Sequence, residues 1–82
     1  MSSVKVLFFA TLRDRAGTKA ADMQIPDGTT VASLTDRIAL EFPGVKPSIP
    51  TVLVAINREY APDEAVVPDG ADVALFPPVS GG

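Results

Sequence analysis

The stretch VKVLFFA at residues 4–10 decides the fold of this chain. It is rich in β-branched and aromatic residues and therefore predicts a β-strand. Successive side chains of a strand point to opposite faces. One face of this strand then carries Val4, Val6 and Phe8, and the other carries Lys5, Leu7 and Phe9. Both faces of the predicted strand therefore bear bulky apolar groups.

A loop and a second strand follow. Residues 11–19 (TLRDRAGTK) are polar with a single glycine and predict a loop. Residues 20–26 (AADMQIP) alternate weakly between apolar and polar side chains, with Ala21, Met23 and Ile25 on one side, and predict a strand. Because Pro26 closes this strand, we expect it at an edge of the sheet, paired with the first strand as a hairpin.

A helix is predicted after the turn signal at residues 26–28. Thr30 is its expected N-cap, with Thr29 as the alternative, and Pro43-Gly44 ends it. Its apolar residues recur with helical spacing and form one stripe: Val31, Leu34, Ile38 and Phe42.

Two more strands are predicted in the second half of the chain. Residues 45–50 form a proline-bearing connector, and residues 51–57 (TVLVAIN) form a strand. The nearly continuous apolar run of this strand suggests a central position covered on both faces. Residues 57–59 predict a turn before Tyr60, and residues 61–67 predict an irregular segment with at most a very short edge strand.

The last strand is predicted at residues 72–76 (DVALF), after a turn at residues 68–70. Val73 and Leu75 share one face, and Ala74 and Phe76 share the other. One helix cannot cover both faces of a four- or five-stranded sheet, so it packs on one face and makes a two-layer α+β domain. The opposite face then exposes Phe9 and Phe76, which we interpret as an apolar patch for a partner.

The composition excludes several classes of function. The chain has 82 residues, enough for one domain, and lacks both cysteine and histidine, which excludes disulfides, thiolate or imidazole metal ligands and nucleophile–histidine catalysis. The net charge of −3 and the absence of a basic run argue against nucleic acid as a partner. The apolar run near the N-terminus is too short for a signal peptide or a membrane span. We therefore expect a cytoplasmic protein with no membrane partner.

The C-terminal run FPPVSGG at residues 76–82 carries the most specific chemical signal. The last two residues lack Cβ atoms, so the end of the chain is slim, can thread a narrow channel and presents the unhindered backbone carboxylate of Gly82. Pro77 and Pro78 forbid further strand pairing and stiffen the exit of the tail. We therefore expect a domain at residues 1–76 and a flexible tail at 77–82. The alternative is an ordinary frayed terminus.

Other polar groups carry weaker signals. Asp63-Glu64 and the pair Asp69 and Asp72 lie in turn-rich sequence, where acidic residues are expected for solvation, so no metal site is predicted. The charged run at residues 13–15 is most simply solvent-exposed, with electrostatic docking as an alternative. No Gly-Lys-Ser/Thr phosphate loop occurs. The chain therefore favours a carrier or subunit whose chemistry other proteins complete.

These stretches resemble a known family. KVLFFATLRDRAG at residues 5–17, VAIN at residues 54–57 and PDGADVALFPPVSGG at residues 68–82 are similar to the small sulfur-carrier subunit of molybdopterin synthase. The resemblance implies a β-grasp, ubiquitin-like fold. It also implies that a ubiquitin-activating-type enzyme adenylates the Gly82 carboxylate with ATP, and that a sulfurtransferase converts the adenylate to a thiocarboxylate.

The resemblance further implies the partners and the site. The loaded tail would enter the large subunit of molybdopterin synthase and give its sulfur to a pterin precursor there, with no cofactor bound to the carrier itself. Phe9, Tyr60 and Phe76 match apolar contact positions for the synthase and the activating enzyme. The residues that thread into the partner would be Gly81, Ser80, Val79, Pro78 and Pro77.

Three alternatives stay open. The first is a sulfur carrier for thiamine biosynthesis, a near relative. The second is a ubiquitin-like modifier, in which a substrate lysine attacks the activated Gly82 instead of sulfur. The third is a pure interaction domain with an inert tail.

Overall fold

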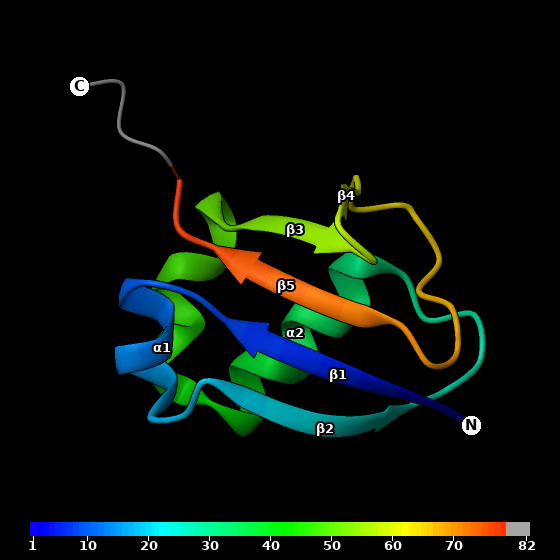
Figure 1. Cartoon of the computed structure of the whole chain (residues 1–82), viewed down its shortest axis with the longest axis horizontal. Coiled ribbons are helices and arrows are strands. Elements are labelled where there is room, and N and C mark those ends of the chain that lie inside the picture. Colours follow the sequence, from blue (N-terminus) through cyan, green and yellow to red (C-terminus); the bar gives the residue numbers. More distant parts are fainter. Residues whose placement is uncertain (79–82) are drawn as a thin grey trace.

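Residues 1–78 of this chain are described by a computed structural model, in which five strands form one mixed sheet with helices on one side of it (Figure 1). Strands pair in the order β2-β1-β5-β3-β4. The strands are β1 (Ser2–Phe8), β2 (Ala20–Ile25), β3 (Leu53–Ile56), β4 (Glu59–Tyr60) and β5 (Asp72–Phe76). The helices are α1 (Thr11–Ala16), α2 (Val31–Glu41) and the 3₁₀-helix η1 (Pro43–Thr51).

The first and last strands lie side by side in the middle of the sheet. β1 and β5 run parallel, with Val6 opposite Val73 and Phe8 opposite Leu75, while β1 and β2 form the predicted antiparallel hairpin. All four of these side chains are almost completely buried. The face parity predicted for β1 and β5 is therefore confirmed, although β1 begins at Ser2 and ends before Phe9.

Helix α2 covers the inner face of the sheet and makes the second layer. Its residues Leu34 and Ile38 are fully buried, and the rings of Phe8 and Phe42 meet edge to face with centroids 5.1 Å apart. The side chain of Thr30 accepts a hydrogen bond from the Ser33 backbone N–H, which confirms it as the N-cap. This two-layer arrangement is the β-grasp fold that was expected.

The segment predicted as a loop at residues 11–19 contains helix α1, so that prediction was wrong. Leu12 is buried in the core and gives this short helix an anchor. Gly17 ends it in the left-handed conformation, with φ of 79°, and its N–H donates to the carbonyl of Arg13. With only Leu12 and Ala16 apolar among its six residues, the segment had too weak a pattern to indicate a helix.

The prediction that residues 45–50 form a plain connector was also wrong. They belong to η1, which buries Val45 against the core although Pro47 and Pro50 lie inside it. The prolines are compatible with these short 3₁₀ turns, because each turn demands few backbone N–H donors.

The position of β3 differs from the prediction. It lies between β5 and β4, and β5 is the central strand. Among residues 1–78 the helices form a single layer on the inner face, so the outer face of β3 has no helix over it and Leu53 is 37% exposed. The short edge strand, expected within residues 61–67, is instead β4, directly after the turn at Asn57 and Arg58.

Neither of the α-helices within residues 1–78 has the length and apolar character that crossing a membrane requires.

Candidate functional site

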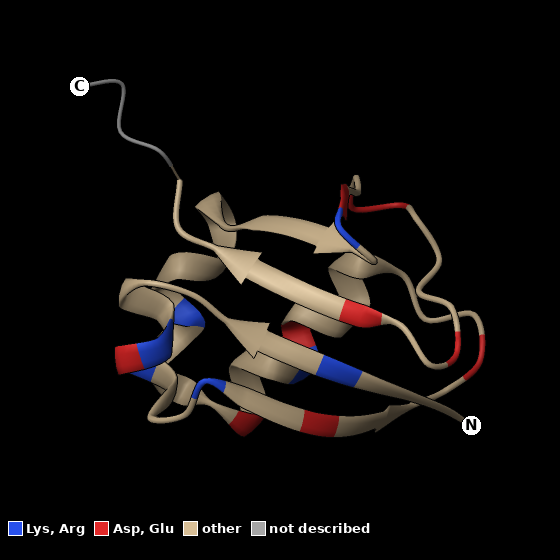
Figure 2. Ribbon diagram, viewed as in Figure 1, with Lys and Arg blue, Asp and Glu red and all other residues tan. Residues whose placement is uncertain are grey.

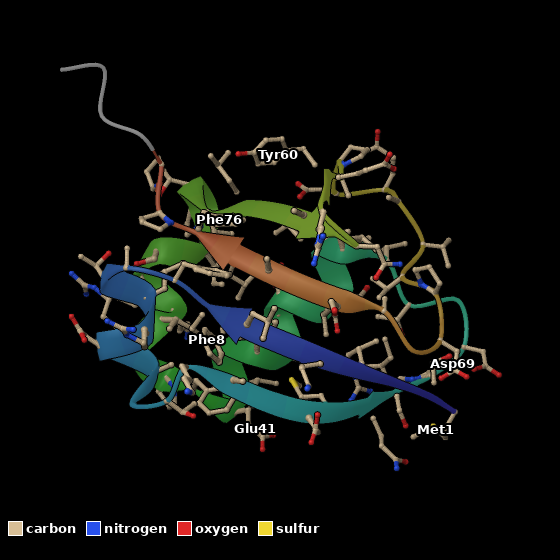
Figure 3. The ribbon with its side chains drawn as sticks, viewed as in Figure 1. Met1, Phe8, Glu41, Tyr60, Asp69 and Phe76 are labelled. Atoms are coloured by element: carbon tan, nitrogen blue, oxygen red, sulfur yellow. The ribbon has the colours of Figure 1, made fainter. Side chains whose placement is uncertain are left out.

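Three aromatic rings from distant parts of the chain gather on the outer face of the sheet. Phe9 and Phe76 stack with centroids 4.7 Å apart and planes 14° from parallel. Tyr60 meets Phe76 edge to face at 6.5 Å. We call Phe9, Tyr60 and Phe76 the aromatic trio. Figure 3 shows Tyr60 above β3 and Phe76 at the end of β5.

Phe76, the central ring of the trio, is the least exposed of the three. Phe76 ends β5 and is half-buried between its two neighbours, whereas Phe9 is 41% exposed and Tyr60 is 74% exposed. Large aromatic side chains that stay this exposed are typical of contact surfaces. The prediction that Phe9 and Phe76 share the outer face agrees with this geometry, and Tyr60 joins them.

The backbone next to Phe9 holds its ring in place. The Phe9 N–H donates to the carbonyl of Leu75 at 3.2 Å, which ties it to β5 although β1 has ended. The next residue, Ala10, has φ of 52° and ψ of −130°, a conformation that costs energy for a residue with a Cβ atom. This bend turns the chain sharply from Phe9 into α1.

A tight hairpin places Tyr60 over the sheet. Asn57 and Arg58 both have positive φ, 50° and 73°, which is the geometry of a two-residue turn that matches strand twist. The Asn57 side-chain oxygen accepts a hydrogen bond from the Asp72 N–H at 3.0 Å. The hairpin is thereby fixed to the start of β5, and Tyr60 pairs with Ala55.

The trio borders a hollow of about 440 Å³ on the outer face. Several of its lining residues were not predicted from the sequence, where Arg58 is expected only as part of a turn. Asn57 was the signal in the sequence that could have revealed a hairpin there, because asparagine favours the positive φ of two-residue hairpin turns. Besides the trio, the hollow is lined by Leu7, Ala55, Arg58, Asp72 and Ala74.

Basic residues gather at one end of the molecule. Figure 2 shows several Lys and Arg residues on α1 and the turn after it, with one acidic residue among them, and several Asp and Glu residues in the loops at the opposite end. Arg13 and Lys19 also line a second hollow beside Phe9. The sequence contains no basic run, but the fold thus brings cations to one border of the trio.

The C-terminal tail begins at the trio. Pro77 is half-buried and Pro78 is exposed directly after Phe76. The predicted threading residues Val79, Ser80 and Gly81, and the predicted reactive group of Gly82, lie outside the described residues.

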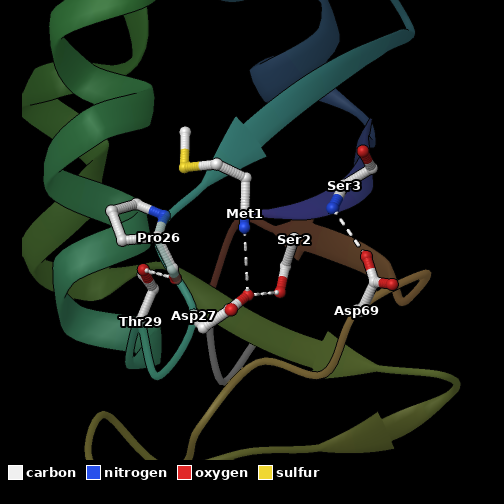
Figure 4. Close-up of polar contacts among 7 residues, drawn as sticks. All are labelled: Met1, Ser2, Ser3, Pro26, Asp27, Thr29 and Asp69. Carbon is white, nitrogen blue, oxygen red and sulfur yellow. Dashed lines mark hydrogen bonds and ion pairs between the residues drawn. The ribbon is translucent and has the colours of Figure 1, made fainter.

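Two acidic residues of the opposite end, Asp69 and Asp27, have structural partners. The Asp69 carboxylate accepts a hydrogen bond from the Ser3 N–H at 2.8 Å. Asp27 accepts one from the Ser2 hydroxyl at 2.7 Å and lies 3.5 Å from the Met1 ammonium, as Figure 4 shows. The hydrogen bond from Ser2, followed by the positive amino terminus, lowers the pKa of Asp27. Within residues 1–78 no three acidic side chains gather as a metal site.

Comparisons with known proteins agree over almost the whole chain. The model of the ThiS family matches residues 6–82. The molybdopterin synthase sulfur carrier subunit of Arabidopsis thaliana is 35% identical, over 96% of this chain and 82% of that protein. The same subunit from Mycobacterium tuberculosis is 32% identical, and the match spans the whole of both chains.

Solved structures show the same fold. SAMP1, a small archaeal modifier protein from Haloferax volcanii, superposes with a TM-score of 0.89 at 27% identity, covering 99% of this chain and all of that one.

Proposed function

Because this chain belongs to the ThiS family, and the curated relatives that it matches over most of their length are molybdopterin synthase sulfur carrier subunits, we propose that it carries sulfur for molybdopterin synthesis. The sulfur acceptor is a pterin precursor bound by the large synthase subunit. The carrier contributes a docking surface and a terminal carboxylate, and it contributes no catalytic side chain of its own.

The chemistry takes place on the Gly82 carboxylate. A carboxylate is a poor electrophile, so a ubiquitin-activating-type enzyme first joins it to AMP from ATP and releases pyrophosphate. A sulfurtransferase then delivers sulfur at the oxidation level of sulfide to the acyl carbon, the bond from that carbon to AMP breaks, and a thiocarboxylate and free AMP result. Its sulfur is a good nucleophile, which suits transfer to the pterin. Gly81 serves as a slim spacer that lets this group reach the reacting centres of both enzymes.

One observation carries the proposal: the central ring of the aromatic trio is also the last residue of the last strand. Phe76 stacks on Phe9 and ends β5, and Pro77-Pro78 follow at once. A partner that covers the trio therefore lies where the tail begins. Docking and delivery of the tail are thereby coupled through a single residue, which is what a carrier requires.

The surroundings of the trio indicate the chemistry of the partner surfaces. The partner needs an apolar pocket for the three rings at the centre of its contact surface, because exposed aromatic anchors commonly dominate the binding energy. Acidic groups are expected at the rim that meets Arg13 and Lys19. Association with the large subunit and with the activating enzyme should therefore weaken as salt is raised.

The test is intact-protein mass spectrometry on untagged chain after incubation with ATP, a sulfur donor and the activating enzyme. We expect the mass gain of one oxygen exchanged for sulfur, located at Gly82. A chain lacking Gly82 is the matched control and should gain nothing. Wild-type chain that gains no sulfur while the enzymes load a known carrier would contradict the proposal.

The similarity to a small archaeal modifier protein supports a second candidate, in which the activated Gly82 is attacked by lysine amines. The two functions are distinguished in cell lysate. Lysine-linked conjugates that disappear when Gly82 is deleted would establish modification. Free thiocarboxylate without conjugates would leave the sulfur carrier alone.

A further inference from the structure

Strand β2 presents an open edge. The Phe8 N–H donates to the Lys19 carbonyl at 2.9 Å. From this pair onward, residue pairs with and without hydrogen bonds between β1 and β2 alternate along the hairpin. The backbone groups of Ala21, Met23 and Ile25 consequently point to β1. Those of Ala20, Asp22 and Gln24 point away from the sheet.

One of these three outward residues is already used. The Thr18 hydroxyl donates to the Ala20 carbonyl at 2.9 Å and accepts from the Ala20 N–H at 3.4 Å. Within residues 1–78, Asp22 and Gln24 are left as the two residues whose N–H and C=O groups face the open side of β2. An edge of this kind is a template for another strand.

We propose that this edge binds the same edge of a second copy of the chain, so that two sheets join into one antiparallel sheet. The two-fold axis passes between the two Met23 residues. Asp22 of each copy then pairs with Gln24 of the other, and the residues with free backbone groups are the ones that meet. A dimer related by a two-fold axis requires this kind of self-complementary pairing.

The same residues disfavour the two neighbouring registers in which β2 of one copy could pair with β2 of the other. A shift that centres the axis on Asp22 places two carboxylates directly opposite each other, and it asks Ala20 to pair although Thr18 holds its backbone groups. A shift that centres the axis on Gln24 sets Asp22 opposite Pro26, which has no N–H to donate.

Helix α2 adds complementary charge beside this edge. A groove between β2 and α2 is lined by Met23, Arg37, Leu40 and Glu41, and Leu40 is 81% exposed. Arg37 and Glu41 lie one turn apart on the same wall. A two-fold axis through the groove directs Arg37 of each copy toward Glu41 of the other and brings both Met23 and Leu40 side chains to one apolar centre.

The proposed contact leaves the carrier surface open. β2 is at one edge of the sheet, whereas Tyr60 lies on β4 at the other edge and Phe76 ends the central strand. The pairing therefore uses none of the aromatic trio and does not depend on the proposed function.

Sedimentation equilibrium on the full chain, from micromolar to millimolar concentration, tests the proposal. We expect a monomer–dimer equilibrium. Gln24→Pro removes an outward N–H without touching the β1 ladder and should raise the dimer dissociation constant by about tenfold or more. Gln24→Thr keeps that N–H and is the matched control, which should stay within a few-fold of wild type.

Charge reversal gives a second test with exposed helix residues, which keeps the proposal testable if Gln24→Pro does not fold. Arg37→Glu and Glu41→Arg should each weaken the dimer, and the double variant should restore it. A chain that stays monomeric at millimolar concentration would overturn the proposal. So would a dimer broken by Phe9→Ala but not by the charge reversals, since that places the contact on the trio. If Gln24→Pro instead weakens only the complex with the large subunit, a foreign strand occupies the edge and the proposal is also wrong.

Discussion

Phe9 and Phe76 stack nearly parallel with centroids 4.7 Å apart, although one ring follows the first strand and the other ends the last. The parallel pairing of β1 and β5 makes this contact possible, because the C-terminal ends of the two strands lie next to each other. The stack therefore exists only when the two ends of the domain have come together.

Replacing Phe76 with alanine should weaken partner binding more than it weakens the fold. The ring is half-buried and in contact with two other rings, so we expect a loss of about 1–2 kcal/mol in unfolding free energy, below the 3–5 kcal/mol of a fully buried Phe. Affinity for the proposed partner, the large synthase subunit, should fall by about thirtyfold or more. Denaturant unfolding and calorimetric titration measure the two effects.

Val66→Ala is the control for this experiment, because Val66 is 57% exposed and lies outside the trio. It should change neither quantity appreciably. A stability loss for Phe76→Ala as large as that of a core phenylalanine, with affinity unchanged, would mean that the ring is structural.

Gly44→Ala should destabilise the domain although Gly44 is at the surface. A Cβ atom there would overlap the backbone carbonyl oxygen of Arg15, and this atom cannot move unless α1 moves relative to η1. We expect a loss of about 1–3 kcal/mol, typical of overpacking. Lys46→Ala, in the same 3₁₀-helix, should stay within about 0.5 kcal/mol of wild type. Equal thermal melting of both variants would contradict this account.

Leu12→Ala tests whether α1 is an integral part of the core. The side chain is 1% exposed, so its truncation should cost about 2–5 kcal/mol of unfolding free energy. Arg13→Ala, the next residue on the same helix, is the matched control and should have little effect on stability. Urea unfolding of both variants provides the measurement, and a negligible cost for Leu12→Ala would show that α1 folds independently of the core.

Asp27→Asn should lower thermal stability at neutral pH but not in acid. The pKa of Asp27 is lowered in the folded state from its ordinary value of 3.8, so its ionised form stabilises the fold above that value. This contribution is lost as the pH falls through the folded-state pKa, where the carboxylate takes up a proton. The gap in melting temperature between wild type and variant should therefore close in acid, and a gap independent of pH would refute the assignment. The untagged amino terminus is needed, since Met1 supplies part of the effect.

Features with a strong period were predictable from the sequence. Alternation in β1 and β5 gave the correct faces for Phe8, Phe9 and Phe76, and the helical stripe from Val31 to Phe42 gave the correct inner layer. Thr30 was correctly identified as a cap because its hydroxyl acts locally, within one turn of the helix.

Features that depend on the assembled sheet were not predictable. The apolar run of β3 resembles that of a central strand, but strand order is decided by long-range pairing, and β5 takes the centre. Helix α1 forms because Leu12 finds a buried site, which no local pattern reveals. Tyr60 was assigned to the site only through the family resemblance, because a two-residue strand has no detectable period.

The central position of β5 has a consequence for biosynthesis. Because β1 pairs with β5, which lies far along the chain, a nascent chain cannot close its sheet while residues 72–76 are still within the ribosome. The same residues complete the aromatic trio. A chain that stops before Phe76 thus loses the central ring of the trio together with part of β5, so under the proposed function it would not compete with the intact carrier for its partners.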